Sequence, residues 1–327
     1  LEEALAADLV WPYLKYHAQL LLGGRPQAKS VEHLVGDSLD LGSATGCVGR
    51  RMTALNYATD LDQLSGDSLI GLIGSGGGEP EEDVDFLSQH TVVGGMQALL
   101  KALVQRSNPQ LEERVSAISR VSEGVRVKTN RRTIDADAVI VTVSIGVLKS
   151  SAIAFEPGLP QWHLDALDGL DMGALSKIWL QYPKTAWPVG QASVIMCDAA
   201  PIHAVFDWSK SHGTPIVMGM TSGRAAVELE ALPKADAQNL VHGALQKQWG
   251  RALPEPVGFA MSRWTQNPLV GGAYMYPNTQ FRSGDHLQLR KPIADRVLLA
   301  GEALADRTGY VDTAWSDGRR AANLLIG

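Results

Sequence analysis

The sequence predicts an α/β fold with an α+β domain inserted into it. Residues 135–143 end in a β-branched run typical of a strand covered on both faces, and a further strand is expected at 296–300. The stretch between them mixes helical and strand-like segments, which indicates an inserted domain. With 327 residues, 45% of them hydrophobic, the chain can bury the large core that such a fold needs.

The elements are expected in a definite order. Leucine spacing and helix-start residues predict that the first 90 residues are mainly helical, beginning with 2–21. A helix is expected next at 96–105, followed by paired strands at 114–120 and 124–129. The remaining elements are a helix at 162–170, strands at 175–182, 204–208 and 216–220, a long helix at 234–249 and a closing helix at 313–325.

Composition argues against several classes of partner. The chain has 35 acidic and 29 basic residues, and the basic ones form no run that would follow a phosphate backbone, so nucleic acid is not expected. Its apolar stretches are too short to cross a bilayer, so we expect no membrane contact and a cytoplasmic location. Cys47 and Cys197 are too isolated for a disulfide framework or a paired-cysteine metal site and are expected as small buried side chains. The eight histidines lack ligand-like spacing, so no metal site is predicted.

A glycine-rich run at 71–78 looks like a dinucleotide-binding turn but lacks its context. Such a turn needs an apolar helix directly after it, whereas an acidic stretch follows at 79–85. Carboxylates would repel a pyrophosphate, so we expect a solvated surface loop. The motifs of serine hydrolases, zinc proteases, calcium loops and P-loop proteins are also absent from the sequence.

Four segments in a fixed order carry the most specific signal. They read TVVGGMQALLKAL at 91–103, ADAVIVTVSIGVLK at 136–149, IAFEPGLPQWHLDALDGLDMGALSKIWL at 153–180 and, within 262–326, SRWTQNPLVGGAY and VLLAGEALADRTGYVDTAWSDGRRAANLLI. In this combination the chain resembles the flavin-dependent amine oxidases. Within that family, its motifs are most similar to those of polyamine oxidases and flavin-dependent lysine demethylases. The resemblance implies an incomplete FAD-binding domain of the glutathione-reductase type and an amine-oxidase substrate domain.

The same resemblance divides the chain into four parts. Residues 1–90 would be a mainly helical part of the substrate domain, and 91–150 a part of the FAD domain. Residues 151–261 would form the substrate-binding domain. The C-terminal part of the FAD domain would be 262–327.

FAD is the cofactor that the resemblance implies. Gly301 and Glu302, in the AGEA segment, would let the backbone approach the flavin and face its ribityl and pyrophosphate region. A helix beginning within 309–314 would direct its N-terminal amides at the reduced flavin. Ala273 stands where some relatives carry a flavin-linking cysteine, so the FAD is expected to be noncovalent. Further cofactor contacts are implied for Val115, Gly309, Tyr310, Val311 and Ala314.

Lys177 and three aromatic residues are the catalytic residues that the resemblance implies. Lys177 matches a lysine that holds a water near flavin N5, and it lies in an apolar segment where a charge is costly to bury. The alternative is that its side chain extends to solvent at a sheet edge. Trp264, Tyr274 and Tyr310 match positions that flank the flavin and form a cage for the substrate amine.

The implied reaction is oxidation of a small-molecule amine to an imine by hydride transfer to flavin N5. Hydrolysis of the imine and reoxidation of the flavin by oxygen, with hydrogen peroxide formed, would follow. One alternative is an L-amino-acid oxidase, which needs an arginine for the substrate carboxylate; Arg50, Arg51 and Arg224 are available. The other alternative is a flavin-free scaffold that keeps the fold as an interaction module.

The chain departs from the family pattern at three places. Ser144 replaces a common proline, and Asp312 and Thr313 replace a polar residue and a glycine beside the flavin. The strand and GxGxxG turn that anchor the dinucleotide do not precede Leu1. We therefore expect that a smaller polypeptide of roughly 100 residues, the size of a domain, supplies that segment, either as the second subunit of a heteromer or as a cleaved N-terminal piece that stays associated. Without this partner the chain is expected to be inactive.

Overall fold

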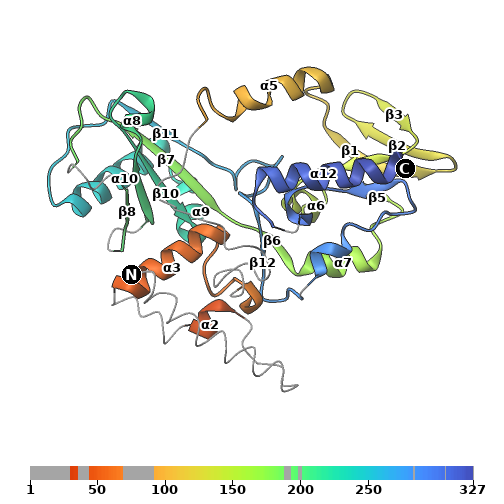
Figure 1. Ribbon diagram of the computed structural model, residues 1–327, viewed down its shortest axis with the longest axis horizontal. Coiled ribbons are helices and arrows are strands. Elements are labelled where there is room, and N and C mark those ends of the chain that lie inside the picture. Colours follow the sequence, from red (N-terminus) through yellow and green to blue (C-terminus); the bar gives the residue numbers. More distant parts are fainter. Residues whose placement is uncertain are drawn as a thin grey trace.

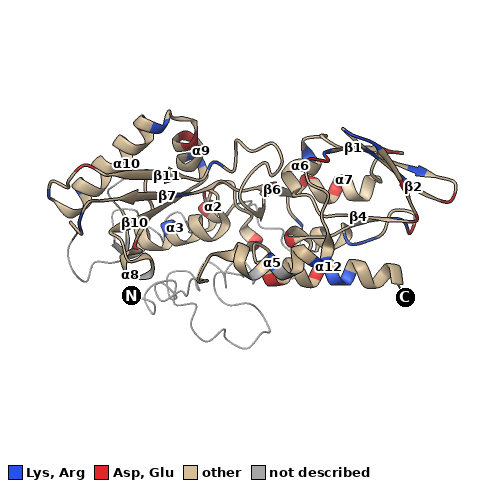
Figure 2. Ribbon diagram, turned by 90° about the horizontal axis from the view of Figure 1, so that it is seen from above, with Lys and Arg blue, Asp and Glu red and all other residues tan. Residues whose placement is uncertain are grey.

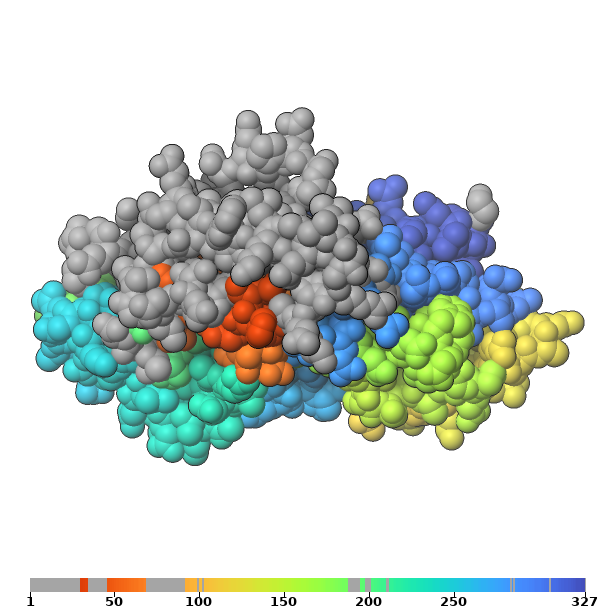
Figure 3. All heavy atoms as spheres, turned by 90° about the horizontal axis from the view of Figure 1, so that it is seen from below, coloured from red at the N-terminus to blue at the C-terminus, as the bar shows by residue number. Residues whose placement is uncertain are grey.

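The computed structural model describes residues 30–35, 44–68, 92–187, 193–197, 201–282, 284–305 and 307–326. These residues form an elongated body with a β-sheet toward each end (Figure 1). In the space-filling view, the segments near residues 216–260 occupy one end and those near 115–170 the other (Figure 3). The expected helix at 2–21 and the glycine-rich run at 71–78 lie outside the described residues.

A five-stranded antiparallel sheet forms the first end. The residues of β7 (Leu175–Gln181) alternate between the two faces of this sheet. Ile178 and Leu180 point toward α9 (Gly223–Ala231) and α10 (Lys234–Trp249) and pack there in one apolar cluster. Helix α3 (Ala44–Tyr57) packs on the opposite face. The strand order is β11 (Gly258–Met261), β7 (Leu175–Gln181), β10 (Ile216–Ser222), β9 (Ala204–Asp207) and β8 (Ser193–Ile195).

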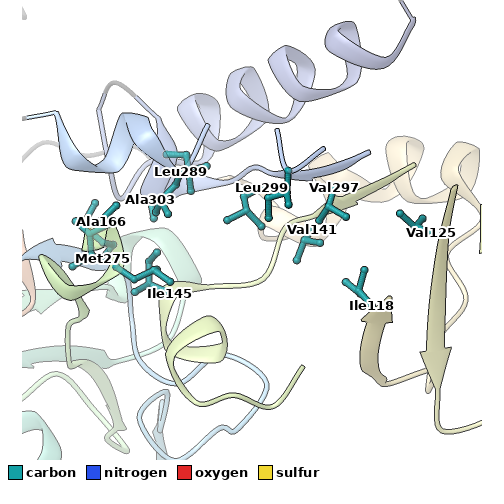
Figure 4. Packing of buried hydrophobic residues seen from close by; sticks show 14 of the residues in the cluster. Ile118, Val125, Val141, Ile145, Ala166, Met275, Leu289, Val297, Leu299 and Ala303 are labelled. Carbon is teal, nitrogen blue, oxygen red and sulfur yellow. The ribbon is translucent and has the colours of Figure 1, made fainter. Parts of the chain in front are cut away.

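The second end is built from a four-stranded sheet and a parallel strand pair. The parallel pair consists of β4 (Val139–Val141) and β13 (Val297–Leu299). Figure 4 shows Val141, Val297 and Leu299 converging in the core that the two sheets share. The four-stranded sheet has the order β3 (Thr133–Ala136), β2 (Gly124–Thr129), β1 (Val115–Val121) and β5 (Ala154–Glu156).

Short elements connect the two ends. The antiparallel pair β6 (Leu170–Met172) and β12 (Met275–Pro277) lies between the two sheets in Figure 1.

In Figure 2, acidic and basic residues are interspersed along the described ribbon. The remaining elements are α2 (Val31–Val35), η1 (Gly66–Ser68), α5 (Met96–Ser107), α6 (Ile145–Lys149), α7 (Gln161–Asp168), α8 (Ser209–His212), α11 (Asp285–Gln288), η2 (Glu302–Leu304) and α12 (Val311–Ile326).

Most expected elements are confirmed, and one is wrong. The predicted strand at 135–143 is two strands in different sheets, β3 and β4. β3 pairs with β2, whereas the backbone N–H of Val139 already donates to the Arg296 carbonyl at 2.8 Å and leads into the pair with β13. The division of the chain at 90, 150 and 261 stays a prediction. Within the proposed 151–261 domain, β5 and α7 pack with the core of Figure 4.

The expectation for the two cysteines is wrong, because Cys47 and Cys197 form a disulfide. It joins α3 to the end of β8 across 150 residues of sequence. No helix among the described residues is long and apolar enough to cross a membrane. The cytoplasmic location stays a prediction, and the disulfide instead favours an oxidising compartment.

Breaking this disulfide is expected to destabilise the protein by roughly 2–5 kcal/mol, because the bond restricts a long loop of the unfolded chain. The measurement is urea unfolding of the oxidised protein with and without reductant. The Cys47→Ser/Cys197→Ser variant should match the reduced protein and ignore the reductant. Equal midpoints for oxidised and reduced protein would contradict the prediction.

Two buried histidines are expected to make the protein sensitive to acid. Burial lowers the pKa of His163 from 6.5 to about 4, and that of His203 from 6.5 to about 3, the latter also through the charge of Arg51. As pH falls below 6.5 the unfolded state takes up these protons first, so stability is full above that pH and declines toward pH 4. Urea midpoints measured across this range should fall. The decrease of the midpoint with falling pH should be smaller in His163→Gln. In the control His212→Gln, at an exposed position, the decrease should be the same as in the wild-type protein.

Candidate functional site

Lys177 lies on the face of β7 that packs against α3. In the antiparallel register Lys177 is opposite Met220, which is in turn opposite Ala204, so the three side chains share a face of the sheet. Met220 and Ala204 belong to an apolar cluster with Leu55 and Tyr274. Lys177 is half-buried. The structure therefore directs Lys177 to the side of the sheet where Tyr274 lies.

Tyr274 is fixed by α3. Its hydroxyl donates to the backbone carbonyl of Leu55 at 2.5 Å. Burial raises the pKa of Tyr274, and the nearby Tyr310 and Glu302 raise it further. The phenol is therefore neutral at physiological pH and presents its ring rather than a charge. Such a ring can orient an amine without competing as a nucleophile.

Tyr310 lies beside Tyr274 and is 46% exposed. The intervening backbone is close-fitting: a Cβ on Gly309 would lie 3.6 Å from the Tyr274 ring, and Gly309 has a φ of +82°. The guanidinium of Arg307 stacks 4.2 Å from the centre of the Tyr310 ring. Two of the predicted cage residues thus meet at the turn that leads into α12.

Tyr57 is a neighbour of this pair that the sequence did not indicate. Burial, together with Tyr310, raises the pKa of Tyr57 to about 12, which places it near Tyr310. Its hydroxyl donates to the Ser68 carbonyl at 3.0 Å. It also lines a pocket of about 180 Å³ whose other walls include Met275 and Thr308. No local motif marks Tyr57, since it is the last residue of an ordinary helix.

Trp264 lies in the loop after β11, and no described contact joins its side chain to Lys177 or to the two tyrosines. The Lys177 backbone N–H donates to the Ser262 hydroxyl at 2.9 Å, and the Ser262 N–H donates to the Lys177 carbonyl at 3.0 Å. Trp264 follows two residues later and is 46% exposed. The loop therefore starts beside Lys177, while the indole keeps a free surface.

Glu302 lies against the same turn. Its two carboxylate oxygens each accept a backbone N–H at 3.0 Å, one from Met275 and one from Gly309. Burial raises the pKa of Glu302, and these two hydrogen bonds oppose that rise. Glu302 thereby ties the residue after Tyr274 to the residue before Tyr310.

The other predicted cofactor residues are placed as follows. Gly301 has a φ of +144°, and no atom of the described residues lies within 4 Å of a Cβ built on it, so a ligand can approach its backbone. Val311 and Ala314 lie in the first turn of α12. Val115 begins β1 and packs against the core of Figure 4, and no described contact joins it to the tyrosines.

The departures from the family pattern have local explanations. The Ser144 side chain caps α6 by accepting the Val147 N–H at 3.2 Å, and its hydroxyl also binds the Val270 carbonyl. Asp312 pairs with Arg307 at 3.3 Å. The Thr313 hydroxyl donates to the Arg307 carbonyl at 2.6 Å. The contacts of Asp312 and Thr313 with Arg307 hold the start of α12 in place.

The three candidate arginines differ in their partners. Arg50 pairs with Glu32, and Arg224 pairs with Asp62 at 2.5 Å. The buried Nε of Arg51 has no hydrogen-bond partner within the described part of the chain. Burial lowers the pKa of Arg51, and nearby Asp60 opposes this change. Arg51 is therefore the first of the three to test as a partner for the carboxylate of an amino-acid substrate.

Comparison with known proteins decides the family. The profile of the flavin containing amine oxidoreductases matches residues 1–326. The chain belongs to this family. Polyamine oxidase 4 of Oryza sativa subsp. japonica is 33% identical over 235 residues, which are 71% of this chain and 48% of that protein. Polyamine oxidase 2 of Arabidopsis thaliana is 32% identical over 71% of this chain and 47% of its own length. This amine oxidoreductase thus spans about half the length of these relatives.

Solved structures agree on the fold. Putrescine oxidase bound to putrescine superposes with a TM-score of 0.78 at 18% identity, covering 91% of this chain and 68% of that one. Cyclohexylamine oxidase from Brevibacterium oxydans gives a TM-score of 0.69 at 18% identity, over 92% and 69% of the two chains. The amine oxidoreductase therefore has the flavin amine oxidase fold, and the cofactor of its family is FAD.

The described residues fit such a cofactor. Open space beside the Gly301 backbone admits a ligand, and the first turn of α12 presents backbone amides to an anion. The structure has no free thiol, because both cysteines of the chain are in the disulfide. That observation supports the prediction that the FAD is held without a covalent link through cysteine.

Proposed function

We propose that this chain supplies the reacting face of an FAD-dependent oxidase of small amines. One observation carries the proposal: Lys177 shares its sheet face with the cluster that contains Tyr274, and Tyr274 adjoins Tyr310 and Glu302. The proposal therefore combines a lysine, aromatic rings and a carboxylate that we predict to face the cofactor. Aliphatic di- and polyamines are the first substrates to test, because the curated relatives include polyamine oxidases.

Bound FAD would accept a hydride from the carbon next to the amine nitrogen, and oxygen would later take the electron pair to form hydrogen peroxide. The chain's own residues prepare the substrate. Tyr274 and Tyr310 present ring faces that hold the amine by cation–π attraction until it loses a proton. Lys177, half-buried on the same face, positions the water that hydrolyses the imine to an aldehyde and an amine or ammonia.

The test is anaerobic titration of the flavin-loaded protein with putrescine, spermidine, a monoamine and L-amino acids. Loss of the oxidised-flavin absorption with amines supports the proposal. Loss with amino acids alone would favour the amino-acid oxidase, in which case Arg51→Met should raise KM for the amino acid. A purified complex without flavin would instead favour the scaffold alternative.

We also propose that a smaller polypeptide carrying the FAD-anchoring βαβ unit covers α5 and the start of α12. Every α5 side chain that the structure describes is exposed, among them Met96, Leu100 and Leu103. A solitary helix of 12 residues is marginal in water, so an apolar face of this kind calls for a covering surface. On α12, Trp315 is exposed as well.

Charged substitutions on α5 test this interface. Leu100→Lys/Leu103→Lys should abolish copurification of the FAD-anchoring polypeptide, because two charges would be buried without partners. Gln97→Lys/Gln105→Lys adds the same charge at exposed polar positions of the helix and should leave copurification intact. A stable, flavin-loaded monomer of this chain alone would contradict the interface.

A further inference from the structure

A buried carboxylate lies behind the site and has no part in the chemistry described above. Glu230, near the end of α9, has no exposed surface. A buried carboxylate is costly unless hydrogen-bond donors surround it. The hydrogen-bond donors around Glu230 therefore indicate the role of its carboxylate.

The donors come from the neighbours of two predicted catalytic residues. One oxygen, Oε1, accepts the hydroxyl of Ser176 at 2.6 Å, and Ser176 directly precedes Lys177. The other, Oε2, accepts the backbone N–H of Thr265 at 3.0 Å and also the Thr265 hydroxyl. Thr265 directly follows Trp264. A single carboxylate thus joins the strand of Lys177 to the loop of Trp264.

The backbone around Glu230 strengthens the same connection. Its carbonyl accepts the side-chain amide of Gln266 at 2.5 Å and is also bound by Arg263. Arg263 reaches on to the Leu232 carbonyl at 2.7 Å. Both residues that flank the Trp264–Thr265 pair are therefore held to the end of α9.

We propose that Glu230 is a positioning residue that fixes Lys177 and Trp264 relative to each other. The catalytic roles of Lys177 and Trp264 rest on the proposed function, whereas the hydrogen bonds that join their neighbours to Glu230 are described contacts. Ser176 and Lys177 are adjacent on a strand and point to opposite faces, so holding Ser176 from behind fixes the direction of Lys177. The free edge of Trp264 is similarly oriented by the anchored residue that follows it.

Glu230→Gln is the most direct test, because the amide keeps the shape but turns one acceptor oxygen into a donor that faces donors. In the flavin-loaded protein, hydrogen exchange of the 262–266 amides should become about tenfold faster or more, since local opening there becomes easier. The rate of flavin reduction by putrescine should fall about tenfold or more, with FAD still bound, because small misplacements of positioned groups are costly. Glu228→Gln, at an exposed position of the same helix, is the matched control and should change neither value.

A milder pair of variants covers the case in which Glu230→Gln fails to fold. Thr265→Val removes one hydroxyl that donates to Glu230, and Thr265→Ser keeps it. Exchange and reduction rate should both change in the valine variant and recover in the serine variant.

The outcomes separate the two proposals. Unchanged exchange at 262–266 in Glu230→Gln or Thr265→Val overturns the positioning role. Faster exchange with an unchanged reduction rate also overturns it, because the contact would then be structural only. If no amine reduces the wild-type flavin, the proposed function fails, while the exchange data still show whether Glu230 holds the loop.

Discussion

Lys177→Met is expected to slow reduction or reoxidation of the bound flavin by about 10²- to 10⁴-fold, the range for loss of a group that handles protons or water at a reacting centre. The FAD should stay bound, because the predicted cofactor contacts lie elsewhere, around Gly301 and Glu302. Methionine keeps the length and the apolar stem of lysine, so β7 should pack as before. Anaerobic and aerobic stopped-flow absorption measure the two half-reactions separately.

Lys184→Met is the control for this prediction, since Lys184 is exposed just beyond the end of β7. It should react at the wild-type rate in both half-reactions. If Lys177→Met did the same, Lys177 would have no role in the chemistry and the alternative of a side chain extending to solvent would be correct.

Glu302→Ala is expected to weaken FAD binding by roughly tenfold to a hundredfold. The substitution leaves the N–H groups of Met275 and Gly309 without their acceptor, at about 1–3 kcal/mol for each one that stays buried. The turn that holds Tyr274 next to Tyr310 should then loosen, and the room for the cofactor beside Gly301 with it. The measurement is an FAD titration of the protein from which the flavin has been removed, together with its thermal midpoint.

Glu123→Ala, at an exposed turn, controls for the loss of one negative charge. Its FAD affinity should equal that of the wild-type protein. An unchanged affinity in Glu302→Ala would show that the carboxylate does not organise the cofactor site, whatever its effect on stability.

Local sequence patterns predicted an element well where the whole segment belongs to one helix or to one sheet. The helix predicted at 234–249 has those bounds as α10, because its capping glycine and apolar spacing are local signals. The strand predicted at 135–143 was wrong because its first part belongs to a local hairpin with β2, whereas its second part pairs with β13, which is far away in the sequence. The disulfide between Cys47 and Cys197 likewise depends on how α3 packs beside β8.

The same distinction holds at the site. Lys177, Tyr274 and Tyr310 stand in motifs that a single sequence shows, and the structure supplies the shared face and the shared turn. Tyr57 and Glu230 stand in no such motif. They join the site only through packing of α3 and α9 against the sheet, so only the folded chain indicates them.

Deuterium-labelled putrescine can show whether this chain presents an amine to a flavin for oxidation at the carbon next to nitrogen. The flavin-loaded protein is mixed anaerobically with putrescine that carries deuterium at those carbons, and the first turnover is followed by the loss of flavin absorption. We expect flavin reduction to be several-fold slower than with ordinary putrescine, and to keep the ordinary rate when the deuterium is on the inner carbons instead. Equal rates for all three substrates, or no reduction by any amine, would contradict it.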